Sequence, residues 1–293
     1  MTVESIKNIA VIGAGTMGQG IAQLCALTGY PVLLYDIQPE LTRTAIATTR
    51  RIFEDLVVRG KITAEQRDAS INRITAVHDF RQLQVDLAIE VVLEKLEIKQ
   101  KILTELEKIN ALDCLLVSNT SSLSITQLAS PLKHKERCAG LHFFNPATVM
   151  KLVEIVKGAA TSDHTMKTLM LFAQSLGKTV AITNDSPGFI VNRINRLFFA
   201  ESLKVVEENV ADFSVVDNLM KATGFRMGPF QLIDLVGIDT SYAVSWSLYE
   251  AFYYEPKFRP SRIQQQKVDA GLYGRKTGKG FYDYPDSETN HRG

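Results

Sequence analysis

The sequence predicts an α/β fold in which a doubly wound parallel sheet is followed by an all-α C-terminal domain. Up to about residue 184, short apolar runs typical of buried strands alternate with helical patterns, and a glycine-rich turn directly follows the first run. Beyond residue 188, apolar residues recur only at helical spacing. This change places a boundary near residues 186–188, so we expect one domain over residues 1–186 and a second over residues 187–293.

Composition and charge are those of an ordinary globular protein. The chain has 293 residues, 45% hydrophobic and 22% charged, which is long for a single core. Its 33 basic and 32 acidic residues balance to a net charge of +1, so neither a nucleic-acid partner nor a membrane surface is indicated. The single cysteines Cys25, Cys114 and Cys138 favour buried, reduced thiols over disulfides or a metal site. With no secretory leader or membrane-length apolar run, we expect a cytoplasmic protein.

The first strand, residues 9–12, leads into the glycine-rich turn GAGTMG at residues 13–18. A helical run to about residue 27 follows, and a second strand over residues 32–35 ends at Asp36, eighteen residues beyond Gly18. This context is the fingerprint of a Rossmann-type dinucleotide site. Gly13 permits the tight turn, Gly15 allows close approach of a pyrophosphate, and Gly18 allows the helix to pack on the strand. Asp36 would bind ribose hydroxyls, so NAD is preferred over NADP; a βαβ unit without cofactor is the alternative.

The remaining elements follow from the same patterns. We expect further strands over residues 85–89, 115–117, 139–144, 152–156 and 179–183. Helices are expected over residues 41–59, from Thr63 onward, over 95–110, near 125, within 157–177, and over 190–208, 215–222, 229–254 and 261–270. The basic, glycine-rich segment at residues 274–280 has the composition of a flexible tail.

Several polar residues follow directly after predicted strands. They are Asp36, Glu90, the turn at residues 119–122, and Asn145. Ligands bind beyond the carboxyl ends of the strands in an open parallel sheet, so this edge is the expected site. One serine of the turn is also expected to cap the helix near residue 125.

Two later strands each carry one polar side chain among apolar neighbours, His142 in the first and Glu154 in the second. A lone polar group in a buried strand costs free energy unless it is paired, so each is the expected partner of the other. A buried carboxylate that fixes the tautomer of an imidazole is what a general base requires. A purely structural hydrogen bond is the alternative.

Two further inferences concern surfaces. The predicted helices of the second half carry more apolar surface than a small domain can bury, which favours homodimerisation through this domain. Arg59 and Lys61 lie between two predicted helices, where they either form a solvated tip or meet the phosphates of a long anionic ligand.

Taken together, these residues closely resemble the short-chain L-3-hydroxyacyl-CoA dehydrogenases, including the bacterial 3-hydroxybutyryl-CoA dehydrogenases. The resemblance covers nearly the whole chain. It rests on the glycine loop at 13–20, SNTSSL at 118–123, GLHFFNP at 140–146, KLVEI at 151–155, DSPGFIVNR at 185–193, MGPFQLIDLVGID at 227–239 and GRKTGKGFY at 274–282.

The resemblance implies roles for individual residues. His142 would be the catalytic base and Glu154 its electrostatic partner, while Ser121 and Asn192 would hydrogen-bond the substrate oxygen. Arg59 would contact the CoA part of an acyl-CoA substrate. Lys61 is a second candidate for that contact because it lies beside Arg59 in the sequence. The residues implied in NAD binding are Gly13, Gly15, Thr16, Met17, Gly18, Asp36, Glu94, Lys99, Asn119, Asn145 and Lys276. No metal is implied.

The sequence departs from the family at two positions and leaves rival families open. Lys95 stands where the family usually has Asn, and Thr148 where it often has Pro. We expect Lys95 to point outward or to pair with Glu90 or Glu97. A lambda-crystallin or gulonate dehydrogenase relative, or an inactive NAD-binding protein, would share the architecture. The 3-hydroxyisobutyrate type is disfavoured because Gly188 stands where that type has lysine.

Overall fold

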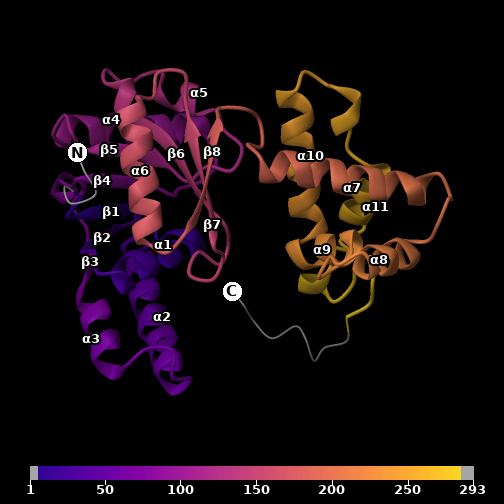
Figure 1. Cartoon of the computed structure of the whole chain (residues 1–293), viewed down its shortest axis with the longest axis horizontal. Helices are drawn as coiled ribbons and strands as arrows, with labels where there is room; N and C mark the ends of the chain where they lie inside the picture. Colours follow the sequence, from indigo (N-terminus) through magenta and orange to yellow (C-terminus); the bar gives the residue numbers. More distant parts are fainter. Residues whose placement is uncertain (1–5, 285–293) are drawn as a thin grey trace. The chain divides into compact units, whose positions relative to one another are not determined.

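A computed structural model of the chain describes residues 6–284. Its contacts divide the chain into two compact units, the first ending at Phe189 and the second beginning at Ile190. The first unit contains a sheet with helices on both faces, and the second contains helices (Figure 1). The predicted fold class, a Rossmann-type doubly wound sheet followed by an all-α domain, is therefore confirmed.

The sheet has eight strands in the order β3-β2-β1-β4-β5-β6-β7-β8. They are β1 (Ile9–Ile12), β2 (Val32–Tyr35), β3 (Ile74–Val77), β4 (Leu87–Glu90), β5 (Leu115–Ser118), β6 (Cys138–Phe143), β7 (Leu152–Lys157) and β8 (Thr179–Asn184). Neighbours from β3 to β6 are parallel, whereas β7 runs antiparallel to β6 and β8 is parallel to β7. The order of the six parallel strands is that of dinucleotide-binding sheets.

Two hydrophobic clusters cover the two faces of the sheet. The helices of this unit are α1 (Thr16–Leu27), α2 (Pro39–Val58), α3 (Ala64–Asn72), α4 (Leu96–Ile109), α5 (Ile125–Ala129) and α6 (Asp163–Ser175). Side chains of α1 and α6 pack with Val11 and Leu141 on one face, while those of α4 and α5 pack with Ile12 and Cys138 on the other. Strand side chains alternate between these faces, so His142 and Glu154 both point to the face of α4 and α5.

The predicted elements of this unit are present, with one strand missed. Thr63 caps α3 in a capping box with Gln66, as the sequence predicts. Strand β3 was not predicted, because it is short, lies at the edge of the sheet and has only Val77 fully buried. An edge strand with little buried apolar surface leaves no clear periodic signal.

The second unit consists of α7 (Val191–Glu207), α8 (Phe213–Ala222), α9 (Pro229–Val236), α10 (Ile238–Ala251) and α11 (Arg262–Asp269). The single helix predicted over residues 229–254 is wrong, since it is divided into α9 and α10 at Gly237. That glycine has a φ of 101°, which a side-chain-bearing residue rarely adopts. Apolar spacing continues on both sides of the break, so periodicity alone could not reveal it.

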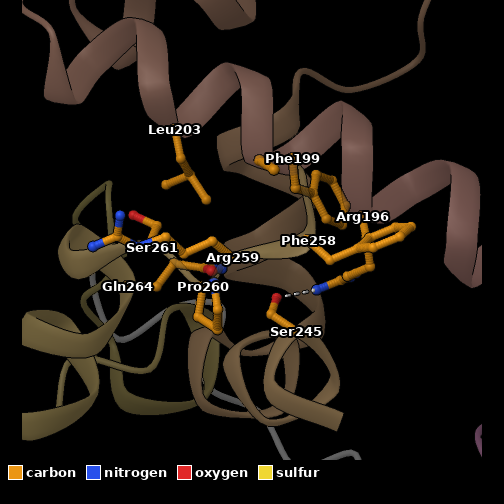
Figure 2. A pocket seen from close by; sticks show the side chains of 10 residues that line it. Arg196, Phe199, Leu203, Ser245, Phe258, Arg259, Pro260, Ser261 and Gln264 are labelled. Atoms are coloured by element: carbon orange, nitrogen blue, oxygen red, sulfur yellow. Dashed lines mark hydrogen bonds between the residues drawn. The ribbon is translucent and has the colours of Figure 1, made fainter. Parts of the chain in front are cut away.

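A buried arginine joins three helices of this unit. Arg196 of α7 donates to the carbonyl oxygen of Ser241 (2.7 Å) and to the hydroxyls of Ser241 (2.9 Å) and Ser245 (3.2 Å) on α10. Gln264 of α11 reaches the same Ser241 hydroxyl. Figure 2 shows the Arg196–Ser245 bond beside the small pocket that these helices line. Burial lowers the pKa of Arg196 to about 10, and the guanidinium also lies 4.8 Å from the ring centre of Phe199.

Two buried aspartates fix the loops of the second unit. Asp217 accepts from the backbone N–H groups of Phe230 and Gln231 at the start of α9. Asp234 accepts from the N–H groups of Phe281 and Tyr282. The segment at residues 274–280 is therefore folded onto α9, and its interpretation as a flexible tail is wrong: a side chain at Gly274 or Gly280 would collide with Asp234.

The three cysteines are free and buried, as expected, and burial raises the pKa of each thiol to about 12. Over residues 6–284, no helix combines the length and apolar character needed to cross a membrane.

Candidate active site

The glycine turn between β1 and α1 is shaped by contacts that exclude side chains. Gly13 has a φ of 112°, and a Cβ there would collide with the carbonyl of Val91. A Cβ on Gly18 would collide with the backbone of Gly13. The turn is therefore held tightly between β4 and α1, as predicted for these two positions.

Gly15 differs from its two neighbours in this turn. A Cβ at Gly15 would have no atom within 4 Å, so its exposed backbone faces open space. It also precedes the first residue of α1, and no side chain caps the N–H groups there. Uncapped N–H groups at a helix N-terminus attract anions, so this position suits the diphosphate of a dinucleotide. Thr16 and Met17 form the first positions of α1 beside it.

Asp36 follows β2 and braces the turn from the side. One carboxylate oxygen accepts from the N–H of Ala14 (2.8 Å) and the other from the N–H of Gln38 (2.9 Å). The carboxylate is thus fixed next to the glycine turn but remains partly exposed. An ionised carboxylate in this position can accept further hydrogen bonds from ribose hydroxyls.

A buried ion pair lies beyond the ends of β4 and β5. The Lys99 ammonium contacts both carboxylate oxygens of Glu90, at 2.7 and 3.0 Å, and neither side chain is exposed by more than 1%. The Ser118 hydroxyl donates to the same carboxylate at 2.6 Å. Buried charges require such pairing, because an isolated one is strongly destabilising.

Glu94 connects this pair to the serine turn. Its carboxylate lies 3.2 Å from the Lys99 ammonium and accepts from the hydroxyls of Thr120 and Ser122 and from the N–H of Ser121. Burial raises the pKa of Glu94, but the Lys99 charge and the hydroxyl donors outweigh it and hold this pKa below its ordinary value. Glu94 therefore sets the conformation of residues 120–122.

The structure places Lys99, which the resemblance implies in NAD binding, inside this network, with its ammonium committed to Glu90 and Glu94. Lys95 is exposed, which agrees with the expectation that it points outward, and Glu90, one of the partners considered for it, is paired with Lys99. Lys99 is one of several charged residues in α4, and the sequence pattern does not distinguish it from the exposed ones. Its inward direction is seen only in the structure.

Asn119 and Asp185 brace the neighbouring backbone. The side-chain oxygen of Asn119 accepts from the N–H of Phe143, next to His142, at 2.8 Å. The expectation that a serine of the turn at 119–122 caps α5 is wrong: the cap is Ser124. Asp185, which follows β8, accepts from the Ser124 hydroxyl and from the N–H of Thr126. Such a contact between distant segments leaves no local sequence signal.

His142 and Glu154 are directly opposite each other in the antiparallel pair β6–β7. The distance from His142 Nδ1 to Glu154 Oε2 is 2.8 Å, and the two residues are 5% and 0% exposed. The predicted contact is thus confirmed. An ionised carboxylate only accepts, so Nδ1 carries the proton and Nε2 is the basic nitrogen.

Two aromatic rings hold the imidazole on its other sides. The ring centre of Phe144 lies 4.5 Å from that of His142, and the ring centre of Phe189 lies at 5.8 Å in an edge contact. Phe189 is buried and has a φ of 50°, which is uncommon for a bulky residue and is typically found at functional sites. The imidazole is therefore restricted in orientation as well as in tautomer.

The other predicted site residues occupy both units. Ser121 is partly exposed and Asn145 is exposed two positions after β6. Arg59 and Lys61 lie exposed at the turn between α2 and α3. In the second unit, Asn192 is near the start of α7, and the Lys276 ammonium pairs with Asp239 at 2.6 Å.

Comparison with known proteins identifies relatives of both units. Residues 8–186 match the family model described as "3-hydroxyacyl-CoA dehydrogenase, NAD binding domain", and residues 188–284 match "3-hydroxyacyl-CoA dehydrogenase, C-terminal domain". The 3-hydroxyadipyl-CoA dehydrogenase of Escherichia coli is 43% identical over 96% of this chain and 59% of its own length. The 3-hydroxybutyryl-CoA dehydrogenase of Bradyrhizobium diazoefficiens is 39% identical over 95% of this chain and 96% of its own.

A solved structure gives the same result in three dimensions. The (S)-3-hydroxybutyryl-CoA dehydrogenase of Ralstonia eutropha superposes with a TM-score of 0.93 at 38% identity, covering 96% of this chain and all of that one. The present chain thus spans little more than half of the E. coli relative and nearly the whole of the other two.

Proposed function

The chain belongs to the 3-hydroxyacyl-CoA dehydrogenase family, and on that premise we propose that it oxidises L-3-hydroxyacyl-CoA to 3-ketoacyl-CoA with NAD and catalyses the reverse reduction. The observation that carries this proposal is the buried pair of His142 and Glu154 on β6 and β7, which belong to the same sheet as the strand β1 that leads into the glycine turn. A base of fixed tautomer beside a dinucleotide site is the minimum that alcohol oxidation requires.

The residues of the glycine turn fit a dinucleotide. Gly15 leaves room for it, the start of α1 offers uncapped N–H groups, and Asp36 offers a fixed carboxylate for the ribose. We assign Asn145, exposed beyond β6, to the nicotinamide end. When bound, NAD supplies the hydride acceptor for the alcohol carbon.

In the proposed mechanism, His142 Nε2 accepts the proton of the substrate's C3 hydroxyl as the hydride leaves that carbon. Glu154 stabilises the imidazolium that forms and keeps its N–H in place. We assign Ser121 and Asn192 to hydrogen bonds with the developing oxygen charge. The Glu94 network supports the first of these, because it fixes the backbone that carries Ser121.

For the acyl group we propose a short chain, as in 3-hydroxybutyryl-CoA, which the names of the Bradyrhizobium and Ralstonia relatives support. A 3-hydroxyadipyl-type substrate, with a second carboxylate on the acyl chain, is the second candidate, because the 43% identical E. coli relative bears that name. The exposed Arg59 and Lys61 are proposed contacts for CoA phosphates.

We also propose that residues 1–186 form the NAD-binding domain and that residues 187–293 bind substrate and form a homodimer. Large apolar side chains of the second unit support this: the exposed fractions of Val215, Leu219, Phe225 and Trp246 are 55%, 62%, 50% and 40%. A monomeric mass in solution scattering at micromolar concentration would contradict the dimer. The three buried thiols support a reducing, cytoplasmic location, which cell fractionation tests.

One assay tests the activity and separates the candidates. The purified chain is mixed with NADH and acetoacetyl-CoA, or with NAD and 3-hydroxybutyryl-CoA, and absorbance at 340 nm is followed. We expect turnover in both directions. Values of kcat/KM across 3-hydroxyacyl chains of C4 to C16 and 3-hydroxyadipyl-CoA then rank the substrates. NADH binding without turnover on any of them would identify an inactive NAD-binding protein instead.

A further inference from the structure

Lys178 is a buried cation in the first unit that the proposed reaction does not use. It lies between α6 and β8, is 9% exposed, and donates from its ammonium to the carbonyl oxygens of Ala147 (2.6 Å) and Met150 (2.7 Å). None of the ion pairs within residues 6–284 includes it. Its charge is therefore balanced by the backbone of a single loop.

That loop, residues 144–151, connects β6 to β7 and carries Asn145. It is closed internally by hydrogen bonds from the N–H groups of Val149 and Met150 to the Pro146 carbonyl. Its end is tied to β8, where the N–H of Thr179 donates to the carbonyl of Lys151 at 2.8 Å. The middle of the loop has no regular structure of its own, so its position depends on these attachments.

The loop also touches the helix that follows the glycine turn. Ala147 is only 2% exposed, and a Cβ at Gly20 of α1 would lie 3.4 Å from the Ala147 Cβ. Ala147 is thus enclosed between α1 on one side and the Lys178 ammonium on the other. Asn145 is two residues away, so whatever fixes Ala147 also fixes Asn145 relative to the dinucleotide turn.

The chemistry of the contact suits lysine alone. A compact ammonium can donate to two carbonyl oxygens that converge on one point, whereas the planar fork of arginine matches carboxylates and phosphates. Burial lowers the pKa of Lys178, so the contact is kept at a cost in desolvation. An apolar side chain would fill the same space without that cost but would leave both carbonyls unsatisfied.

We propose that Lys178 is a positioning residue of the dehydrogenase site, which holds loop 144–151 and thereby sets Asn145 against the bound cofactor. The inference rests on the proposed function, in which Asn145 contacts the nicotinamide end. Lys178 does not act on the proton transfer, because the ladder between β6 and β7 fixes His142 and Glu154 independently of the loop.

The test compares Lys178→Met with Lys167→Met, a matched control at an exposed position of α6. NADH affinity is measured by fluorescence titration, apart from turnover. We expect Lys178→Met to weaken NADH binding about tenfold, by analogy with the lower end of what removing an outer-shell partner costs at metal sites. The KM for NADH should rise similarly, with the pH profile of kcat unchanged. The control should match the wild type in all three.

A double-mutant cycle with Asn145→Ala shows whether Lys178 acts through Asn145. If it does, Lys178→Met should add little to the loss that Asn145→Ala already causes, since coupled residues are not additive. Additive losses would overturn the proposal, as would unchanged NADH affinity in a folded Lys178→Met protein of lowered Tm. Lys178→Arg should restore less than half of the lost affinity, and full rescue would contradict the argument from shape.

Two further outcomes are decisive. If Lys178→Met does not fold, Lys178→Gln retains a donor for one carbonyl and takes its place. Insolubility of both would make Lys178 a folding requirement and would overturn a positioning role. If the wild type binds NADH without turnover, the proposed function fails, whereas the affinity measurements still decide the role of Lys178.

Discussion

The buried carboxylates of the two units have different hydrogen-bonding partners. In the first, Glu154 is paired with an imidazole and Glu90 with an ammonium, whereas in the second, Asp217 and Asp234 accept from backbone N–H groups and tyrosine hydroxyls. An imidazole can gain and lose a proton near neutral pH and so can take part in proton transfer, whereas a backbone N–H cannot. Burial raises the pKa of both tyrosine hydroxyls, so these groups also keep their protons. In the proposed mechanism, the difference separates the unit that carries the base from a unit in which buried acids hold loops and helix ends in place.

The comparison is tested most directly at the base itself. Replacing His142 by Gln keeps a hydrogen-bonding side chain but removes the proton acceptor, so kcat should fall by about 10³ or more. NADH binding should be retained, because His142 belongs to no part of the dinucleotide turn. Turnover is followed at 340 nm and binding by fluorescence titration. Loss of NADH binding in this variant would refute the assignment of His142 as the base.

Glu154→Gln tests the partner of the base. Since the carboxylate orients and stabilises the imidazole without taking the proton, kcat should fall by about 10², less than for His142→Gln. The matched control is Asp217→Asn, which changes an equally buried acid of the second unit. An unchanged rate in the Glu154 variant would remove this residue from the mechanism.

Asp36→Arg sharpens the comparison within the first unit, because Asp36, like Asp217, is held by backbone N–H groups. Its effect should therefore fall on cofactor choice and leave the chemical step alone. We expect the ratio of kcat/KM for NAD to that for NADP to fall by about tenfold or more, since an arginine would attract the 2′-phosphate. An unchanged ratio would mean that the ribose is held elsewhere.

Asp217→Ala tests the second unit. It leaves the buried N–H groups of Phe230 and Gln231 without an acceptor, so we expect a loss of about 1–3 kcal/mol in the free energy of unfolding. Urea denaturation followed by circular dichroism measures it. The kcat of the folded fraction should stay near the wild-type value, and a loss comparable to that of Glu154→Gln would break the division between the units.

The smallest expected effect is a difference in pH dependence. Burial raises the pKa of Asp234, and its backbone donors only partly offset this, so its stabilising contribution is lost as pH rises through the raised pKa. The pKa of Glu94 is lowered, so its contribution is present above the ordinary value of 4.5 and is lost as pH falls. The free energy of unfolding is measured between pH 3 and 6, a range of about one and a half units either side of that value. Asp234→Asn should make this free energy rise more steeply with pH, and Glu94→Gln should make it rise less steeply. Equal slopes in both variants would contradict this.

The local parts of the fold and site could be predicted from the sequence. The glycine turn, its flanking strand and helix, and Asp36 form one contiguous segment, and His142 and Glu154 stand out because their neighbours are apolar. Contacts between distant segments could not be predicted. The inward direction of Lys99, the tether from Asp185 to α5 and the Lys178 contact all depend on how the strands are ordered.

Two misses have a local cause. Gly237 interrupts an apolar pattern that remains helical on both sides, and a single glycine does not distinguish a break from a tolerated substitution. Gly274 and Gly280 belong to a segment whose composition is typical of a flexible tail, but only glycine fits at these two positions because Asp234 lies against them. Gly237 is explained by its backbone conformation and the other two glycines by their neighbour in space, and neither can be read from the spacing of apolar residues.

The antiparallel pairing of β7 with β6 affects which sequence changes the site can tolerate. Glu154 lies on the strand that directly follows the strand of His142, so both residues belong to one hairpin. A change in the length of the connecting loop would not separate them, because the pairing of the strands holds them opposite each other. The proton chemistry thus depends on one short stretch of chain, whereas cofactor preference depends on Asp36 in another, so each can change by substitutions that leave the other in place.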